Sequence, residues 1–226
     1  MCGRFAFYSP AEAAARLFGV EDAQPVEARW NIAPTQYVAS VREGDDGREL
    51  VMLRWGLVPF WAKEPSIGNR MINARAETVA EKPAFRAAYR KRRCLVLADG
   101  FYEWHREGDA KTPYFISAAD GEPFAFAGLW ESWTDKESGD ALQTATILTT
   151  EADAFMGRLH HRMPVLLREA GADRWLGPDQ AEPLAAATDA PRLQAWPVAK
   201  TVNNARNEGA ELIEADGPTL GDAAAG

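Results

Sequence analysis

Cysteine and histidine are the residue types that this sequence has least of. Its 226 residues include two cysteines, Cys2 and Cys94, and three histidines, His105, His160 and His161. The cysteines match neither a disulfide framework nor the spacing of a zinc site, a pattern typical of proteins in a reducing, intracellular environment. With so few ligating side chains we expect no metal site, and the sequence indicates no other cofactor.

Long apolar runs are also missing. No run approaches the roughly 20 residues of a membrane-spanning helix, and Arg4 and the polar stretch 9–12 interrupt what would have to be a signal peptide. We therefore expect a cytoplasmic protein that does not contact membranes. The formal net charge of −8 argues against an indiscriminate nucleic-acid binder but allows a local basic groove.

The strand-like segments are short, rich in β-branched and aromatic residues, and bounded by glycine, proline and aspartate. They are 50–55, 94–98, 101–104, 113–118, 124–129, 144–150 and 163–167. Asp120-Gly121, between two of these segments, is typical of a hairpin turn. The number of short strands predicts a curved, mainly antiparallel sheet with a barrel-like core.

Four helices are expected around this sheet. One begins with Ser9 as N-cap, Pro10 in the first position and Glu12 closing a capping box. The others fall near 82–91, 151–158 and 169–176, and the basic end of the second, 90–93, fits either a helix C-terminus or a DNA contact. We predict one α+β domain over residues 1–215, with residues 216–226 forming a disordered tail.

Cys2 is the most unusual residue in the sequence, because a cysteine near a chain end has little to pack against. If Met1 is removed, Cys2 carries an α-amino group and a thiol on adjacent carbons. A 1,2-aminothiol is a distinctive reagent. Cys94, within the apolar segment CLVLA, is instead expected to be a buried small hydrophobic residue.

Three further polar residues stand among apolar or glycine neighbours: Asn73, Glu103 and His160. Each also has a purely structural interpretation. Asn73 can hold a turn, His160 can cap a helix, and Glu103 can face solvent by strand alternation, which puts Phe101 on its face and Tyr102 on the other. Taken singly, these residues do not distinguish a site from a scaffold.

Together, the motifs resemble the SOS response-associated peptidase (SRAP) family. They cover nearly the whole chain in the family's order and are MCGRF at the start, WNIAPTQ at 30–36, RWGLVPFW at 54–61, INARAET at 72–78, ADGFYEW at 98–104, LHHRMPVLL at 159–167 and VNNARNEGAELI at 202–213. One residue departs from the pattern. His161 stands where the family often has an acidic residue, and its side chain is expected to point away from His160.

The resemblance implies that the protein shields abasic sites in single-stranded DNA by a covalent protein–DNA crosslink, and we expect it to act as a monomer. It implies Cys2 as the crosslinking residue, with Asn73, Glu103 and His160 around it. The residues that it implies for DNA binding are Arg4, Arg75 and Arg162 on phosphates, Phe60 and Trp61 against bases, and Asn31 and Thr149.

The chemistry of Cys2 fits this role. An amine attacks the open-chain aldehyde of an abasic deoxyribose to give an imine, and the adjacent thiol closes a five-membered thiazolidine. His160 is the better candidate to protonate the sugar ring oxygen, and Glu103 can move protons to and from the amine. Two other functions stay open: a cysteine or N-terminal-nucleophile peptidase, and a non-covalent reader of modified or single-stranded DNA.

Overall fold

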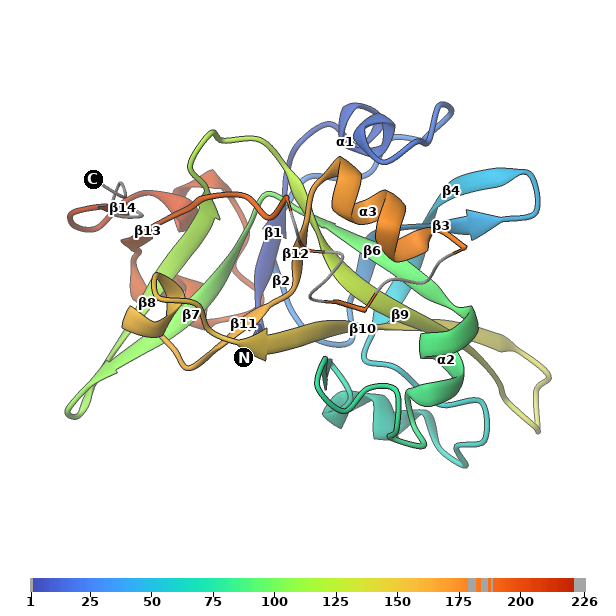
Figure 1. Cartoon of the computed structure of the whole chain (residues 1–226). Coiled ribbons are helices and arrows are strands. Elements are labelled where there is room, and N and C mark those ends of the chain that lie inside the picture. The colour runs from blue at the N-terminus through green and yellow to red at the C-terminus, as the bar shows by residue number, and fades with distance from the viewer. Residues whose placement is uncertain (1, 179–181, 184–186, 188, 222–226) are drawn as a thin grey trace.

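The computed structural model of the chain describes residues 2–178, 182–183, 187 and 189–221 (Figure 1). One sheet has the strand order β14-β13-β8-β7-β1-β2. Its strands are β1 (Phe5–Phe7), β2 (Arg29–Ile32), β7 (Gly100–Glu107), β8 (Ala110–Ala118), β13 (Leu193–Pro197) and β14 (Leu220–Gly221). Every pairing described within this sheet is antiparallel.

The second sheet closes on itself as a five-stranded barrel, because β9 and β10, at either end of the order β10-β4-β3-β6-β9, also pair with each other. The barrel strands are β3 (Tyr37–Gly44), β4 (Gly47–Trp55), β6 (Arg93–Ala98), β9 (Phe124–Thr134) and β10 (Ala141–Glu151). Three short strands extend it: β5 (Asn73–Arg75), β11 (Arg162–Pro164) and β12 (Leu166–Leu167). The predicted single α+β domain with a curved, mainly antiparallel and barrel-like core is confirmed.

Helices are short and lie outside the barrel (Figure 1). They are α1 (Ala11–Leu17), α2 (Arg86–Lys91) and α3 (Glu169–Leu176), with the 3₁₀ turns η1 (Pro65–Arg70), η2 (Met156–Arg158), η3 (Lys200–Asn203) and η4 (Ala210–Ile213). In the described part of the chain, no helix is long and apolar enough to cross a membrane.

Strand β1 joins the two sheets and fixes the start of the chain. It pairs with β2 on one side and β7 on the other. The ring of Phe5 packs edge-on against Trp55 of β4 and Phe126 of β9, with centroids 5.2 and 5.5 Å apart. Since Phe5 is fully buried, the residues just before it are held at the junction between sheet and barrel.

Two local predictions near the helices and turns were wrong. Helix α1 begins at Ala11 with Pro10 in the N-cap position and without a side-chain cap, because the Ser9 hydroxyl donates to the buried Asp99 carboxylate instead. The turn at Asp120-Gly121 does not form a hairpin, because it links β8 to β9, which belong to different sheets. Gly121 does adopt a left-handed φ of 77° there.

The predicted helix at 151–158 is mostly absent, since β10 continues to Glu151 and only the single turn η2 follows. The C-terminal segment also differs from expectation: Leu220–Gly221 pairs with β13, while residues 222–226 lie outside the described residues. At the basic end of α2, Arg92 pairs with Glu131 at 2.7 Å, and Arg93 is buried against the rings of Tyr89 and Trp175. These two arginines are structural.

Candidate functional site

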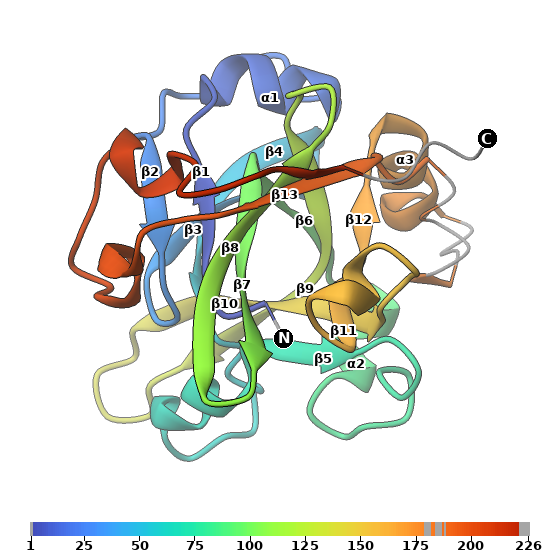
Figure 2. The ribbon, with the colours of Figure 1, turned by 90° about the vertical axis from the view of Figure 1, so that its left-hand side faces the viewer.

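The first described residues lie at the centre of one face of the molecule, between the β7–β8 ribbon, β5 and β11 (Figure 2). Cys2 is fully buried there. Its carbonyl oxygen accepts a hydrogen bond from Nδ2 of Asn73 at 2.8 Å. A residue that sequence position alone would leave at a frayed terminus is therefore anchored inside the fold.

Asn73 reaches Cys2 because β5 lies along β10 in parallel, with Asn73 opposite Ile147 and Arg75 opposite Thr149. Ala74, between them, is buried. Strand alternation therefore turns Asn73 and Arg75 to the opposite face of β5. The Oδ1 atom of Asn73 is buried and has no hydrogen-bond partner among the described residues, so an unused acceptor lies beside Cys2.

Glu103 and His160 form the other half of the site. Glu103, on β7, is 6% exposed, so the interpretation that it faces solvent is wrong. One of its oxygens accepts the backbone N–H of Trp104 at 3.1 Å, and the other lies 3.9 Å from Nδ1 of His160, which follows η2. Both side chains line a cavity of about 640 Å³.

Burial controls the ionisation of this site. It raises the pKa of the Cys2 thiol to about 12, and the nearby Glu103 carboxylate adds to the rise. Burial also lowers the pKa of His160, although Glu103 acts in the opposite direction. In the state described, the site therefore holds a protonated thiol, and its histidine favours the neutral form.

The main chain of Arg162 faces Nδ1 of His160 with both a donor and an acceptor. Its N–H lies 3.0 Å from Nδ1 and its carbonyl oxygen 3.1 Å from the same atom. The N–H serves the tautomer with its proton on Nε2, and the carbonyl serves the one with its proton on Nδ1. Because Nδ1 is satisfied in both states, His160 can exchange a proton at Nε2 without losing its anchor.

His161 does not point away from His160, contrary to expectation. Its ring stacks on that of His160, with centroids 4.3 Å apart and planes inclined by 28°. His161 is exposed and His160 is partly buried. The two imidazoles therefore form a pair at the mouth of the cavity that holds Glu103.

Arg4 and Asn31 are linked to each other and to the loop after η3. The Arg4 guanidinium donates to Oδ1 of Asn31 at 2.6 Å and to the carbonyl of Val202 at 2.8 Å. The Asn31 amide donates to the carbonyls of Asn204 and Asn207. Asn31 is completely buried and holds the loop and Arg4 in place, while its expected DNA contact stays a prediction.

Thr149 and Arg162 are also engaged inside the protein. Thr149 is fully buried in this structure, and its expected DNA contact stays a prediction. Arg162, 9% exposed, forms a two-pronged ion pair with Glu77 at 2.7 and 3.0 Å and donates to the Thr149 carbonyl at 2.7 Å. These bonds give Arg162 a structural role, while its Nε has no hydrogen-bond partner among the described residues, and its expected phosphate contact stays a prediction.

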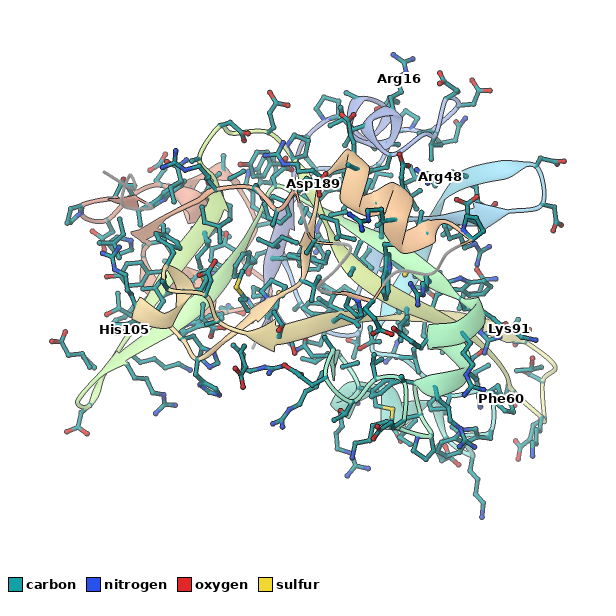
Figure 3. The ribbon with its side chains drawn as sticks, in the orientation of Figure 1. Arg16, Arg48, Phe60, Lys91, His105 and Asp189 are labelled. Atoms are coloured by element: carbon teal, nitrogen blue, oxygen red, sulfur yellow. The ribbon has the colours of Figure 1, made fainter. Side chains whose placement is uncertain are left out.

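Arg75, Phe60 and Trp61 remain available to a partner. Arg75 is exposed on the face of β5 that carries Asn73. Phe60 and Trp61 are 60% and 50% exposed, which is unusual for large apolar side chains. Phe60 lies on the opposite side of the view from His105, which lines the Glu103 cavity (Figure 3). The expected contact of Phe60 and Trp61 with bases stays a prediction.

Comparison with known proteins identifies the family. The sequence model described as SOS response associated peptidase (SRAP) matches residues 1–205. The chain belongs to the SRAP family. "Abasic site processing protein YoaM" of Bacillus subtilis is 40% identical over 225 residues, covering 96% of this chain and 99% of that protein. "Abasic site processing protein YedK" of Escherichia coli is 35% identical over 227 residues, covering 95% and 99%.

Solved structures with this SRAP fold include a protein from Bacteroides thetaiotaomicron. It superposes with a TM-score of 0.82 at 26% identity, covering 95% of this chain and 99% of that chain. A protein from Bordetella bronchiseptica gives a TM-score of 0.75 at 26% identity, covering 88% of this chain and 100% of that chain.

Two residues beside the site were not predicted from the sequence: one is aromatic and the other is basic. Trp104 and Lys111 line both the Glu103 cavity and a neighbouring cavity of about 640 Å³ that includes Gly3, Arg4 and Lys200. The ammonium of Lys111 lies 5.4 Å from the ring centroid of Trp104. The signal was present for Trp104, which ends the motif ADGFYEW, but only the antiparallel register of β7 and β8 brings Lys111 near it.

Proposed function

We propose that this protein processes abasic sites in single-stranded DNA by forming a covalent crosslink through Cys2 after Met1 is lost. The names of its relatives support abasic DNA as the substrate. The observation that carries the crosslink is the position of Cys2, bonded to Asn73 and in the electrostatic field of Glu103. A fold that buries its N-terminal cysteine among polar groups provides a place for a 1,2-aminothiol to react.

The ionisation of Cys2 sets the order of the reaction. An unperturbed α-amino group has a pKa of about 7.7–8.0, so part of it is neutral near pH 7. The thiol has an unperturbed pKa of about 8.5, which burial raises in the chain that retains Met1, so it is mostly protonated at this pH. The amine therefore attacks the sugar aldehyde first, and loss of water gives an imine. The thiol sulfur then bonds to the imine carbon while its proton passes to the nitrogen. The balance is aldehyde plus aminothiol to thiazolidine plus water.

His160 and Glu103 handle the protons in this proposal. Opening the closed sugar requires a proton at the ring oxygen and removal of one from the anomeric hydroxyl. His160 does both through Nε2, since Arg162 satisfies Nδ1 in either tautomer. Glu103 serves the amine and the hydroxyl that leaves as water. The unpartnered Oδ1 of Asn73 accepts from the Cys2 amine or a sugar hydroxyl.

The DNA strand is expected to contact the exposed Arg75 on β5 and the Trp104–Lys111 pair beside the Glu103 cavity, with Trp61 as a further exposed aromatic surface. Arginine forks and lysines bind phosphates, and aromatic faces stack bases at about 1–3 kcal/mol each without sequence preference. These basic and aromatic residues lie on a protein whose net charge is −8. They support selective binding of a strand.

A peptidase is the less favoured function. A cysteine nucleophile works as the thiolate, and reactive cysteines have a depressed pKa. In the chain that retains Met1, burial instead raises the pKa of the Cys2 thiol to about 12. The peptidase chemistry we propose is limited to removal of Met1, which lies outside the described residues. A non-covalent reader would need neither the amine nor the thiol of Cys2.

Intact-mass spectrometry of the protein incubated with an abasic oligonucleotide tests the proposal. The wild type should lack Met1 and gain the mass of the oligonucleotide less one water. Cys2→Ser should give only an imine, lost on heating unless trapped by borohydride, and Cys2→Ala no heat-stable adduct. Cys94→Ala, which removes the other buried cysteine, is the matched control and should still crosslink. A heat-stable adduct from Cys2→Ala would refute the mechanism.

A further inference from the structure

The pairing of His160 with His161 has a consequence beyond the crosslink itself. The two rings are in stacking contact, 4.3 Å between centroids. Both line the cavity that contains Glu103, together with His105, Lys111 and Arg158. Because stacked rings limit each other's rotation, the plane of His160 is set by His161 on one side and by the main chain of Arg162 at Nδ1.

Several charged groups act on His160 from the elements packed around it. Glu103 of β7 favours the imidazolium form, whereas the chain's N-terminal amino group and His161 oppose it. The wall of the cavity adds the cations Arg106, Lys111 and Arg158. The Glu103 carboxylate lies 3.9 Å from Nδ1, and among the positively charged or titratable bases around the ring His161 alone stacks on it, with centroids 4.3 Å apart. A change in the charge of His161 therefore acts on His160 at close range.

We propose that His161 is a positioning residue for His160, which fixes the ring by stacking and, when it carries a positive charge, keeps His160 in the neutral form. Neutral His160 has a lone pair at one ring nitrogen, and the anomeric hydroxyl needs that base. The reaction should therefore persist to lower pH than it would beside a neutral or acidic side chain. This consequence rests on the proposed function, but the ring contact and its effect on titration do not.

NMR titration of the imidazoles provides a test without DNA. The chain has three histidines, so single substitutions assign every imidazole resonance. His161→Phe keeps an aromatic ring and removes the charge, and the titration midpoint of His160 should rise. His161→Asp replaces a positive charge beside the His160 imidazolium with a negative one. The titration midpoint of His160 should therefore rise further, by about one pH unit relative to wild type.

His105→Phe is the matched control, because His105 lines the same cavity but its Nδ1 contacts the Leu159 carbonyl. It should leave the His160 midpoint within about 0.2 units of wild type, well inside the one-unit change expected for Asp. An equal midpoint in wild type, His161→Phe and His161→Asp would overturn the electrostatic part of the inference.

The stacking part is tested by crosslinking rates above the titration range, where charge no longer matters. His161→Phe should react within about twofold of wild type, whereas His161→Ala should be several-fold slower, because misplaced reacting groups lose rate steeply. Equal rates for Ala and Phe would refute the positioning role. If wild type forms no adduct while the midpoints shift as expected, the proposed function fails and the electrostatic inference stands.

Discussion

The hydrogen bond from Asn73 to the Cys2 carbonyl should control how fast the crosslink forms. It spans 2.8 Å and ties Cys2 to β5. Asn73→Ala removes the donor and also the unpartnered Oδ1 acceptor. Since the α-amine that reacts belongs to the same residue as this carbonyl, loss of the bond frees the nucleophile to move.

The size of the effect follows from two terms. One hydrogen bond contributes about 0.5–1.5 kcal/mol net, which corresponds to about 2–12-fold in rate. A displacement of about 1 Å in a reacting group can cost about 100-fold. We therefore expect Asn73→Ala to slow adduct formation by about 10–100-fold. Asn73→Asp should be slower still, because a carboxylate would face the Cys2 carbonyl.

Adduct formation is measured as the heat-stable, shifted band on a denaturing gel under single-turnover conditions, with binding measured separately by anisotropy. Asn69→Ala is the control, since Asn69 is exposed and its side chain accepts a hydrogen bond from Arg54 at 3.4 Å. Asn73→Ala crosslinking at the wild-type rate, with an unchanged urea midpoint, would show that the bond does not position Cys2.

Two further predictions concern the arginines. Arg162→Ala should lower the free energy of unfolding by about 1–3 kcal/mol in urea titration, because the Thr149 carbonyl loses its donor, although the half-exposed Glu77 limits the loss. The hydrogen bond from Arg162 lowers the pKa of Glu77 in the folded state. The ion pair therefore contributes its full stabilisation above the unfolded pKa of Glu, about 4.3, and this contribution is lost as the pH falls through the lower pKa of the folded state. Arg75→Ala should instead leave stability unchanged and reduce the salt dependence of DNA binding by about 0.7 log units per log unit of salt; an unchanged slope would place the strand elsewhere.

The barrel was predictable because the apolar and β-branched residues of its strands are visible in the sequence. β6 reads RCLVLA and is buried throughout, and the expected strands at 94–98 and 124–129 fall within β6 and β9. The short strands β1, β5 and β14 gave no comparable pattern. They form by pairing with longer strands, as β5 does with β10. The hairpin prediction at Asp120-Gly121 was wrong because local turn chemistry does not specify which sheet the next strand joins.

The site was predictable as a set of residues but not as a set of contacts. Cys2, Asn73, Glu103 and His160 come together as the resemblance implied, while their chemical roles stay predictions. The structural roles of Asn31 and Thr149 could not be predicted, because polarity in a motif does not distinguish a ligand contact from a side chain that binds buried main-chain groups. Both satisfy buried main-chain groups, a need that is visible only once the chain is folded.

The topology explains why side chains such as Asn31 and Asn73 are needed to hold the start of the chain. A terminal residue can use both its α-amine and its side chain, but a terminus is also the part of a chain that frays most easily. Here β1 lies in the interior of its sheet, paired on both sides, and Phe5 is locked into the barrel. Arg4 is tied through Asn31 to the loop after η3, and Cys2 to β5 through Asn73. Distant segments of the chain thus hold Cys2 in place, so under the proposed function Asn31→Ala and Asn73→Ala should slow the reaction of Cys2.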